Sequence, residues 1–371
     1  MNLCPKKISL LACAALAWVA IQGAHAQQTE ASSALIARLG LIEADKPVRE
    51  LPGWRAPKKV VVAADVPLAD LRAAAPGVAF VVVRNMANPE VDVSDADAMI
   101  GGCTQALLEK AQQVRWLQVM TAGAERCLAV PAVKQRQLLL TNMQRTEGDT
   151  VSEHAIALAL ALARNLDNFI VNQQQGLWNR SGESGVLRSL NGKTLLVVGL
   201  GGIGTDIARR GQAMGMKVVA TRASGRTGPP FVSYVGLSNE LLTLAKDADV
   251  IINAAPLTPE TTGLFDAKFF AVLKPSAYFV NIARGSSVVD SALIAALEEK
   301  RLAGAALDVT DPEPLPADHP LWRTPNLIIT PHIASVADLE RDNQLAVLLE
   351  NVRRYAAGEK MLSVVDLQRG Y

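Results

Sequence analysis

The chain has 371 residues, of which half are hydrophobic and a fifth are charged. This length suffices for two domains of ordinary size, and the composition excludes a mainly disordered or collagen-like chain. Lys and Arg together number 37 against 36 Asp and Glu, so the chain has no basic excess for binding nucleic acid or an anionic membrane.

The first 26 residues have the pattern of a cleavable secretory signal. Lys6 and Lys7 form a positive n-region, residues 8–21 form an apolar run, and Ala24-His25-Ala26 is a small-x-small cleavage motif. We therefore expect export to the periplasm as a mature chain beginning near Gln27, and removal of the two lysines changes the formal charge from +1 to −1. An uncleaved anchor is the alternative. The apolar run is shorter than the ~20 residues of a spanning helix, so we expect no stable membrane anchor.

Two of the four cysteines, Cys4 and Cys13, lie in that segment, which leaves Cys103 and Cys127 in the mature chain. An oxidising compartment would allow a disulfide, but the spacing does not require one, and two free, partly buried thiols are the favoured expectation. Because no Cys/His cluster has metal-ligand spacing, we expect no metal site.

After an irregular lead-in with a helical stretch at 31–39, short aliphatic runs alternate with helical segments up to Asn142. The runs predict five strands, at Val60–Ala63, Ala79–Val83, Ala98–Ile100, Trp116–Met120 and Leu138–Leu140. The helical segments include Leu68–Ala75 and Thr104–Gln112. Continuous apolar strands alternating with helices predict a parallel sheet covered on both faces, which places this domain in the α/β class.

A helical stretch without Gly or Pro, Glu153–Leu166, leads to a second and stronger α/β series. Six strands are predicted, at Leu195–Val198, Lys217–Ala220, Val250–Asn253, Tyr278–Asn281, Ala305–Val309 and Leu327–Thr330. Helices such as Ile203–Met214 and Ser291–Glu299 connect them, so the pattern predicts a doubly wound sheet. We expect a last helix, Asp338–Ala356, to pack back on the first domain.

The first strand of this series runs directly into a G-x-G-x-x-G motif and then a helix. Gly199 allows the tight turn, Gly201 lets the backbone approach a pyrophosphate, and Gly204 permits close helix–strand packing. Free N–H groups at the helix start would face the phosphates. The expected cofactor contacts here are Gly199, Gly201, Gly202, Ile203 and Gly204. A glycine-rich turn without a ligand is the alternative.

The next strand ends in Thr221 and Arg222, where an NAD-binding protein usually carries an acidic residue for the ribose. Arg222, with Arg226 nearby, suits the additional 2′-phosphate of NADP because a guanidinium binds phosphate bidentately. We therefore favour NADP(H) over NAD(H). The alternative is a solvated Arg222 and a site indifferent to the phosphate.

Between Asn191 and Ser335 the chain carries an ordered series of short motifs. They are NGKT at 191–194, APLTPET at 255–261, LKP at 273–275, NIARG at 281–285, ALDV at 306–309, EPL at 313–315 and PHIA at 331–334. In this order they resemble the D-isomer-specific 2-hydroxyacid dehydrogenases, which include glyoxylate/hydroxypyruvate reductases. The resemblance implies two Rossmann-like domains: a discontinuous substrate domain, 27–153 and 335–371, and an NAD(P)-binding domain, 154–334. It also implies a homodimer.

The resemblance assigns three catalytic residues, and the chemistry of each side chain fits. Arg284, at the end of a strand, would bind the carboxylate and carbonyl of a 2-oxo acid as a permanent cation. His332 would exchange the hydroxyl proton near neutral pH, and Glu313 would hold and charge that imidazole. Taken singly, the three could be a strand-end ion pair, a loop histidine and a solvated carboxylate. A formate dehydrogenase is disfavoured, because such enzymes carry glutamine in place of Glu313.

Other residues are assigned by the resemblance alone. Asp308 matches a residue near the nicotinamide end of the cofactor, and its alternative is a helix or turn cap. The backbone of Ala122 and Gly123 would hold the substrate carboxylate, and Arg84 would contact the substrate. His154 is expected to pack within its helix, and His319 lies in a loop. The expected cofactor set also includes Pro256 and Ala283.

The sequence thus predicts an oxidoreductase that reduces a small 2-oxo acid, such as glyoxylate or hydroxypyruvate, to a D-2-hydroxy acid by hydride transfer from NAD(P)H. The alternative is a non-catalytic, exported dinucleotide-binding protein. Export conflicts with the scarcity of reduced nicotinamide outside the cytoplasm, and the sequence does not resolve that conflict.

Overall fold

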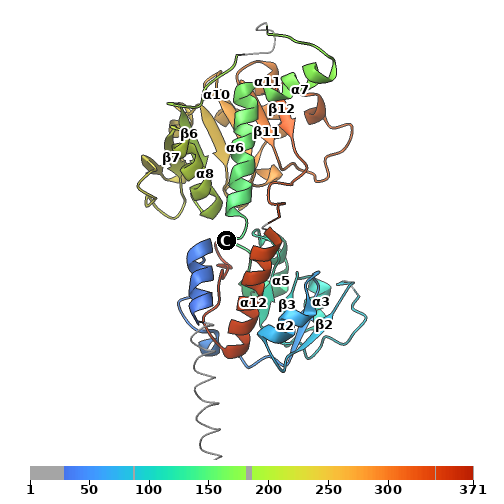
Figure 1. Ribbon diagram of the computed structural model, residues 1–371. Helices are drawn as coiled ribbons and strands as arrows, with labels where there is room; N and C mark the ends of the chain where they lie inside the picture. The colour runs from blue at the N-terminus through green and yellow to red at the C-terminus, as the bar shows by residue number, and fades with distance from the viewer. Residues whose placement is uncertain (1–28, 87, 181–185, 339, 371) are drawn as a thin grey trace, which may run out of the picture. The chain divides into compact units, whose positions relative to one another are not determined.

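The computed structural model describes residues 29–86, 88–180, 186–338 and 340–370 (Figure 1). They form two compact units, each built around a parallel β-sheet. The first unit comprises the described residues up to Thr121 with Val130–Thr146 and Gln344–Val365. The second comprises Ala122–Ala129, Glu147–Asn343 and the residues from Asp366. Two parallel sheets with intervening helices confirm the predicted α/β class, whereas the predicted secretory signal lies outside the described residues.

The first unit contains a five-stranded sheet with the order β2-β1-β3-β4-β5. Its strands are β1 (Lys59–Val62), β2 (Ala79–Val82), β3 (Ala98–Ile100), β4 (Trp116–Gln118) and β5 (Leu139–Thr141). Its helices are one over residues 29–39, η1 (Val48–Glu50), α2 (Leu68–Ala74), α3 (Gln105–Lys110), α5 (Pro131–Gln135) and most of α12 (Glu340–Ala357). All five predicted strands are confirmed, with ends shifted by one or two residues.

The last helix, α12, completes the core of this first unit. Its Val347, Leu348 and Val352 pack in one buried cluster with α2 and the strands. The ring of Tyr355 packs on that of Trp116 with 4.7 Å between the centroids. Helix α12 therefore packs on the first unit, as expected from its length and position at the end of the chain.

The second unit contains a seven-stranded sheet with the order β12-β11-β10-β9-β6-β7-β8. Its strands are β6 (Thr194–Val198), β7 (Lys217–Thr221), β8 (Tyr234–Gly236), β9 (Val250–Asn253), β10 (Tyr278–Asn281), β11 (Gly304–Leu307) and β12 (Leu327–Ile329). Strand β8 was not expected, so the prediction of six strands is wrong by one. The chain runs from β6 outward to β8 and returns to β9 on the other side, which creates a doubly wound switch point.

Helices cover both faces of this sheet. The helices of this unit are α4 (Glu125–Leu128), α6 (Gly148–Arg164), α7 (Leu166–Gln174), α8 (Gly202–Ala213), η3 (Ser238–Glu240), α9 (Leu241–Ala245), α10 (Ala267–Ala271), η4 (Gly285–Ser287), α11 (Asp290–Glu298) and η5 (Pro320–Arg323). Successive residues of a strand face opposite sides. Leu195 and Val197 thus pack with α6 and α8, whereas Leu196 and Val198 pack with α9, α10 and α11. Figure 1 shows α6 and α8 together on one face.

Helices α6 and α7 meet at Asn165, which adopts a left-handed conformation with φ of 55°. Helix α6 begins at Gly148, five residues before the predicted start. Among the described residues no single helix has the length and hydropathy of a membrane span. Helices α6 and α7 have that length and hydropathy only when taken together, and a 70° bend separates them.

Cys103 and Cys127 are each disulfide-bonded. The favoured expectation of free thiols is wrong, because spacing along the chain does not report which sulfur atoms the fold brings together. Cys127 lies in α4.

Candidate active site

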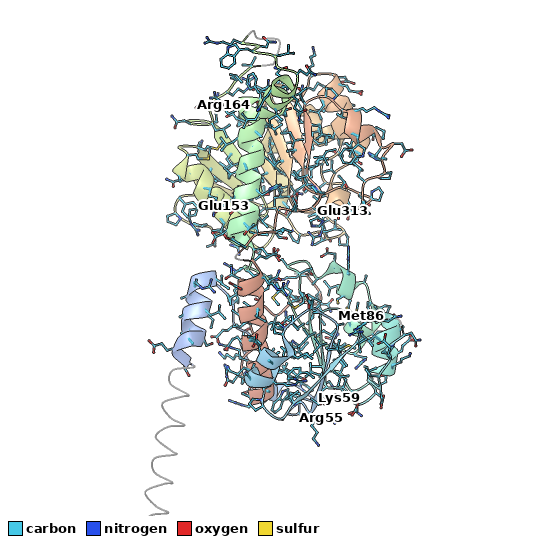
Figure 2. All side chains as sticks on the ribbon, turned by 45° about the vertical axis from the view of Figure 1, so that its right-hand side comes forward. Arg55, Lys59, Met86, Glu153, Arg164 and Glu313 are labelled. Atoms are coloured by element: carbon cyan, nitrogen blue, oxygen red, sulfur yellow. The ribbon has the colours of Figure 1, made fainter. Side chains whose placement is uncertain are left out.

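The predicted cofactor and catalytic residues of the second unit follow the carboxyl ends of its parallel strands. Because every strand pair is parallel, these ends meet at one edge of the sheet. Figure 2 places Glu313 at the same end of the unit as Glu153, in the first half of α6, and away from Arg164 at the end of that helix. In chain order the residues are Gly199 after β6, Arg222 after β7, Pro256 after β9, Arg284 after β10, Asp308 after β11 and His332 after β12.

The three glycines of the G-x-G-x-x-G motif differ in what a side chain would meet at their positions. Gly199 has φ of +94°, and a Cβ there would lie 2.6 Å from the backbone of Ala255. A Cβ on Gly204 would lie 2.0 Å from the carbonyl oxygen of Gly199. At Gly201, the N-cap of α8, an added Cβ would have no atom within 4 Å. The open space over this helix start fits a pyrophosphate approaching the backbone, with Gly202 and Ile203 as the first helical residues.

The two arginines after β7 are held differently. Arg222 donates from Nε to the hydroxyl of Ser224 at 2.8 Å and from Nη1 to the carbonyl oxygen of Thr227 at 3.0 Å. Arg226 donates to the Tyr234 hydroxyl at 2.8 Å and forms an ion pair with Glu240 at 2.7 Å. Hydrogen bonds from Tyr234, from the Leu237 amide and from Arg226 lower the pKa of Glu240 to about 2. Arg226 is therefore already neutralised by a carboxylate.

Thr221, the last residue of β7, is buried and acts through its backbone. Its carbonyl oxygen accepts hydrogen bonds from the amides of Gly199 and Leu200, both at 3.1 Å. This pairing ties the glycine loop to the strand that precedes Arg222.

A buried amide network fixes the backbone of Arg284. Its carbonyl oxygen accepts hydrogen bonds from Asn281 Nδ2 at 2.9 Å and Ser287 Oγ at 2.7 Å. Asn253, at the end of β9, donates to both Asn281 and Ser287. The amide of Ala283 donates to Asn281 at 3.1 Å. Residues at the ends of β9 and β10 therefore hold this arginine in place.

The Arg284 side chain lies against the segment that the resemblance assigns to the substrate carboxylate. Its Nε donates to Glu125 Oε1 at 2.7 Å. A Cβ on Gly123 would lie 1.9 Å from Arg284 Nη2, so a larger residue there would displace the guanidinium. Burial alone would raise the pKa of Glu125, but attraction and hydrogen bonding by Arg284 outweigh it, and the pKa is lowered. Glu125 was missed in the sequence, where a carboxylate in a polar turn has no distinguishing signal.

His332 and Glu313, which the resemblance assigns to acid–base chemistry, lie in contact. Nδ1 of His332 lies 2.8 Å from Glu313 Oε2, and the amide of Thr310 donates to Glu313 Oε1 at 3.1 Å. The histidine side chain is 46% exposed. With Nδ1 on the carboxylate, Nε2 is the nitrogen that can exchange a proton with a substrate.

Asp308, expected near the nicotinamide end of the cofactor, is bonded to the turn after β12. Its side chain has no exposed surface, and its carboxylate accepts hydrogen bonds from the Thr330 hydroxyl at 2.7 Å and from the amides of Ile333 and Ala334, both at 3.0 Å. Asp308 therefore caps the turn that carries His332, in agreement with the alternative considered for it.

The remaining predicted residues are less informative. Arg84 follows β2 in the first unit and is exposed. Pro256 is exposed, and its carbonyl oxygen accepts from the Thr261 hydroxyl at 2.7 Å. Ala122 is half-buried. Among the described residues no group of three or more His, Cys, Asp and Glu side chains could hold a metal ion.

Comparisons with known proteins point to one family. The model of the D-isomer specific 2-hydroxyacid dehydrogenase NAD-binding domain matches residues 156–334. Glyoxylate/hydroxypyruvate reductase B of Escherichia fergusonii is 33% identical, over 70% of this chain and 81% of its own. Glyoxylate/hydroxypyruvate reductase A of Photorhabdus laumondii is 30% identical, over 74% of this chain and 87% of its own.

A solved structure agrees with these relatives. A D-isomer specific 2-hydroxyacid dehydrogenase from Xanthobacter autotrophicus, in complex with NADPH and MES, matches with a TM-score of 0.73 and 28% identity, over 85% of this chain and all of its own. These similarities do not favour the alternative of a non-catalytic dinucleotide-binding protein.

Proposed function

Because the chain belongs to the D-isomer-specific 2-hydroxyacid dehydrogenase family, we propose that it reduces a small 2-oxo acid, such as glyoxylate or hydroxypyruvate, with NADPH. The observation that carries the proposal is the set of groups at one sheet edge: a glycine loop, a cation and a His–Glu pair. A dinucleotide, a carboxylate and a proton donor are what this reduction requires.

The cofactor, when bound, supplies the hydride. The open face of Gly201 at the start of α8 would receive its pyrophosphate, and Arg222 would receive a 2′-phosphate. The related Xanthobacter autotrophicus dehydrogenase was solved with NADPH, which supports the preference.

Arg284 would bind the substrate carboxylate and polarise the 2-oxo group, since Glu125 holds its guanidinium and the buried amides hold its backbone. His332 would donate its Nε2 proton to the carbonyl oxygen as it becomes a hydroxyl. Glu313, in contact with Nδ1, would orient the ring throughout.

The proposal is tested with the mature chain from Gln27 in a spectrophotometric assay. NADPH and NADH are offered with glyoxylate, hydroxypyruvate, pyruvate and phenylpyruvate, and His332→Ala is the control. Oxidation of NADPH by one of the acids, with loss of roughly 10²–10⁴-fold in the control, is the expected result. Binding of NADPH without turnover of any acid would overturn the proposal.

We also propose that the protein is a homodimer. None of the nine residues of α7 is buried, and Ile170 and Val171 are 54% and 49% exposed. Trp178, just beyond the helix, is 92% exposed. A run of exposed large apolar side chains marks an interface more often than free surface.

Export to an oxidising compartment is proposed from the signal pattern and is supported by the disulfide-bonded state of Cys103 and Cys127. We expect an intact mass that begins at Gln27 in the periplasmic fraction. A mass that begins at Met1 in the cytosol would contradict it.

A further inference from the structure

The catalytic histidine proposed above has an unusual backbone. His332 has φ of +51°, in the left-handed region that residues other than glycine uncommonly adopt. Such a conformation persists only where the surrounding structure imposes it. The contacts of residues 330–334 therefore decide where the His332 ring lies.

Asp308 imposes that conformation from two directions. Its carbonyl oxygen accepts the amide of His332 itself at 2.7 Å. Its carboxylate holds Thr330 before the histidine and the amides of Ile333 and Ala334 after it. One residue thus holds both sides of the turn.

A second histidine reaches the same carboxylate from α6. His154 Nε2 lies 3.0 Å from Thr330 Oγ1 and 3.4 Å from Asp308 Oδ1. Because the Thr330 hydroxyl donates its proton to Asp308, its oxygen is left to accept the proton on Nε2 of His154. The His154 side chain is 23% exposed. Its contacts with Thr330 and Asp308 go beyond the packing within its helix that the sequence predicts.

We propose that His154 is a positioning residue for the acid–base chemistry of His332, acting through Thr330 and Asp308. Its N–H donor fixes the Thr330 hydroxyl toward Asp308, and Asp308 then keeps the turn in the left-handed form. This inference rests on the proposed reductase function for its kinetic test, but its structural test does not.

Two substitutions separate the donor from the bulk of the side chain. His154→Gln keeps an N–H donor at similar reach, and His154→Leu removes it. The matched control is His319→Leu, because His319 also lies beside a carboxylate, that of Asp290 at 3.7 Å, and its side chain is 22% exposed. Within the described part of the chain His319 forms no hydrogen bond or ion pair with the turn at 330–334, and it has no role in the proposed site.

We expect His154→Leu to lower kcat roughly tenfold, as small misplacements of a reacting group do, with KM for NADPH and for the 2-oxo acid within about twofold of wild type. His154→Gln should recover most of the lost kcat, and His319→Leu should resemble wild type. A kcat within about twofold of wild type in His154→Leu, or no recovery in His154→Gln, would overturn the inference.

Hydrogen exchange measured by mass spectrometry tests the same inference without turnover. The amides of Ile333 and Ala334 should exchange several-fold faster in His154→Leu than in wild type, His154→Gln or His319→Leu. Unchanged exchange would overturn the inference even if the enzyme is active. Faster exchange in a protein that turns over none of the acids would uphold the structural role of His154 and reject the reductase function.

Discussion

Arg222 and Arg226 differ in what already binds them, and this difference predicts cofactor selectivity. Arg226 is paired with Glu240, whereas Arg222 is held by a hydroxyl and a carbonyl oxygen. We expect Arg222→Ala to raise KM for NADPH roughly tenfold, because a charge-assisted hydrogen bond to the 2′-phosphate is lost. The KM for NADH, which lacks that phosphate, should stay nearly unchanged. Arg226→Ala is the matched control and should change the NADPH preference much less. Equal effects of the two substitutions in steady-state kinetics would contradict this assignment.

Asp308 should make the stability of the second unit sensitive to acid. Burial alone would raise the pKa of Asp308, but hydrogen bonds from His154, Thr330 and the amides of Ile333 and Ala334 outweigh it and lower the pKa from 3.8 to about 2. A carboxyl group whose pKa is lower in the folded than in the unfolded protein stabilises the fold at any pH above its unfolded pKa. This stabilisation is lost as the pH falls through the folded pKa. The contribution is about 2 kcal/mol.

Urea unfolding of wild type and Asp308→Asn measures this contribution. The wild type should be the more stable protein at about pH 6, and the difference should shrink as the pH falls from about 4 toward 2. A difference that does not depend on pH would show that Asp308 acts by packing alone.

At this residue scale the sequence predicts groups better than it predicts their partners. The glycine loop was predicted from its strand–motif–helix context, and Arg284 and the His332–Glu313 pair were predicted from an ordered series of motifs that resembles one family. Glu125 and His154 were given no part in the site, because each meets its partner across more than 150 residues of chain. Such pairings exist only once the sheet has been assembled.

The junction between α6 and α7 shows how one residue can end one helix and begin another. Asn165 has φ of 55° and serves as the C-cap of α6 and the N-cap of α7. We expect Asn165→Ala to destabilise the protein by about 1 kcal/mol, because Ala pays for the left-handed conformation that Asn and Gly tolerate. Asn165→Gly should cost less, although it loses the hydrogen bond from Asn168. Equilibrium unfolding in urea gives both values, and an Ala variant as stable as the Gly variant would contradict this explanation.

Strands with an aliphatic run were predicted from the sequence, even where they have only three residues, and β8 was not. Most strands of the two sheets appear as aliphatic runs because they are buried on both faces. Strand β8 is Tyr234–Gly236, which contains a single aliphatic residue, and it follows Pro229 and Pro230, so its sequence resembles a loop. The 29–39 helix and α12 were predicted as helices, but only the fold shows Ser32 bonded to Glu350 and Arg354 in the first unit.

For the whole molecule, the exposed apolar residues of α7 predict the assembly. We expect light scattering to give a dimer mass for wild type and a monomer mass for Ile170→Glu, because a charge at a buried apolar contact is costly. Leu242→Glu is the matched control, since Leu242 is 41% exposed on α9, away from α7 in the sequence. A dimer that survives Ile170→Glu would exclude α7 as the interface.

The strand order of the second sheet also separates the residues proposed to recognise the dinucleotide from those proposed for the chemical step. Directed evolution could therefore address the two tasks independently. Arg222 follows β7 on one side of the β6–β9 switch, whereas Arg284, Asp308 and His332 follow β10, β11 and β12 on the other. Substitutions at well-separated positions without shared partners tend to have additive effects. A library restricted to residues 222–240 should therefore retarget the dinucleotide while the rate of the chemical step is inherited unchanged.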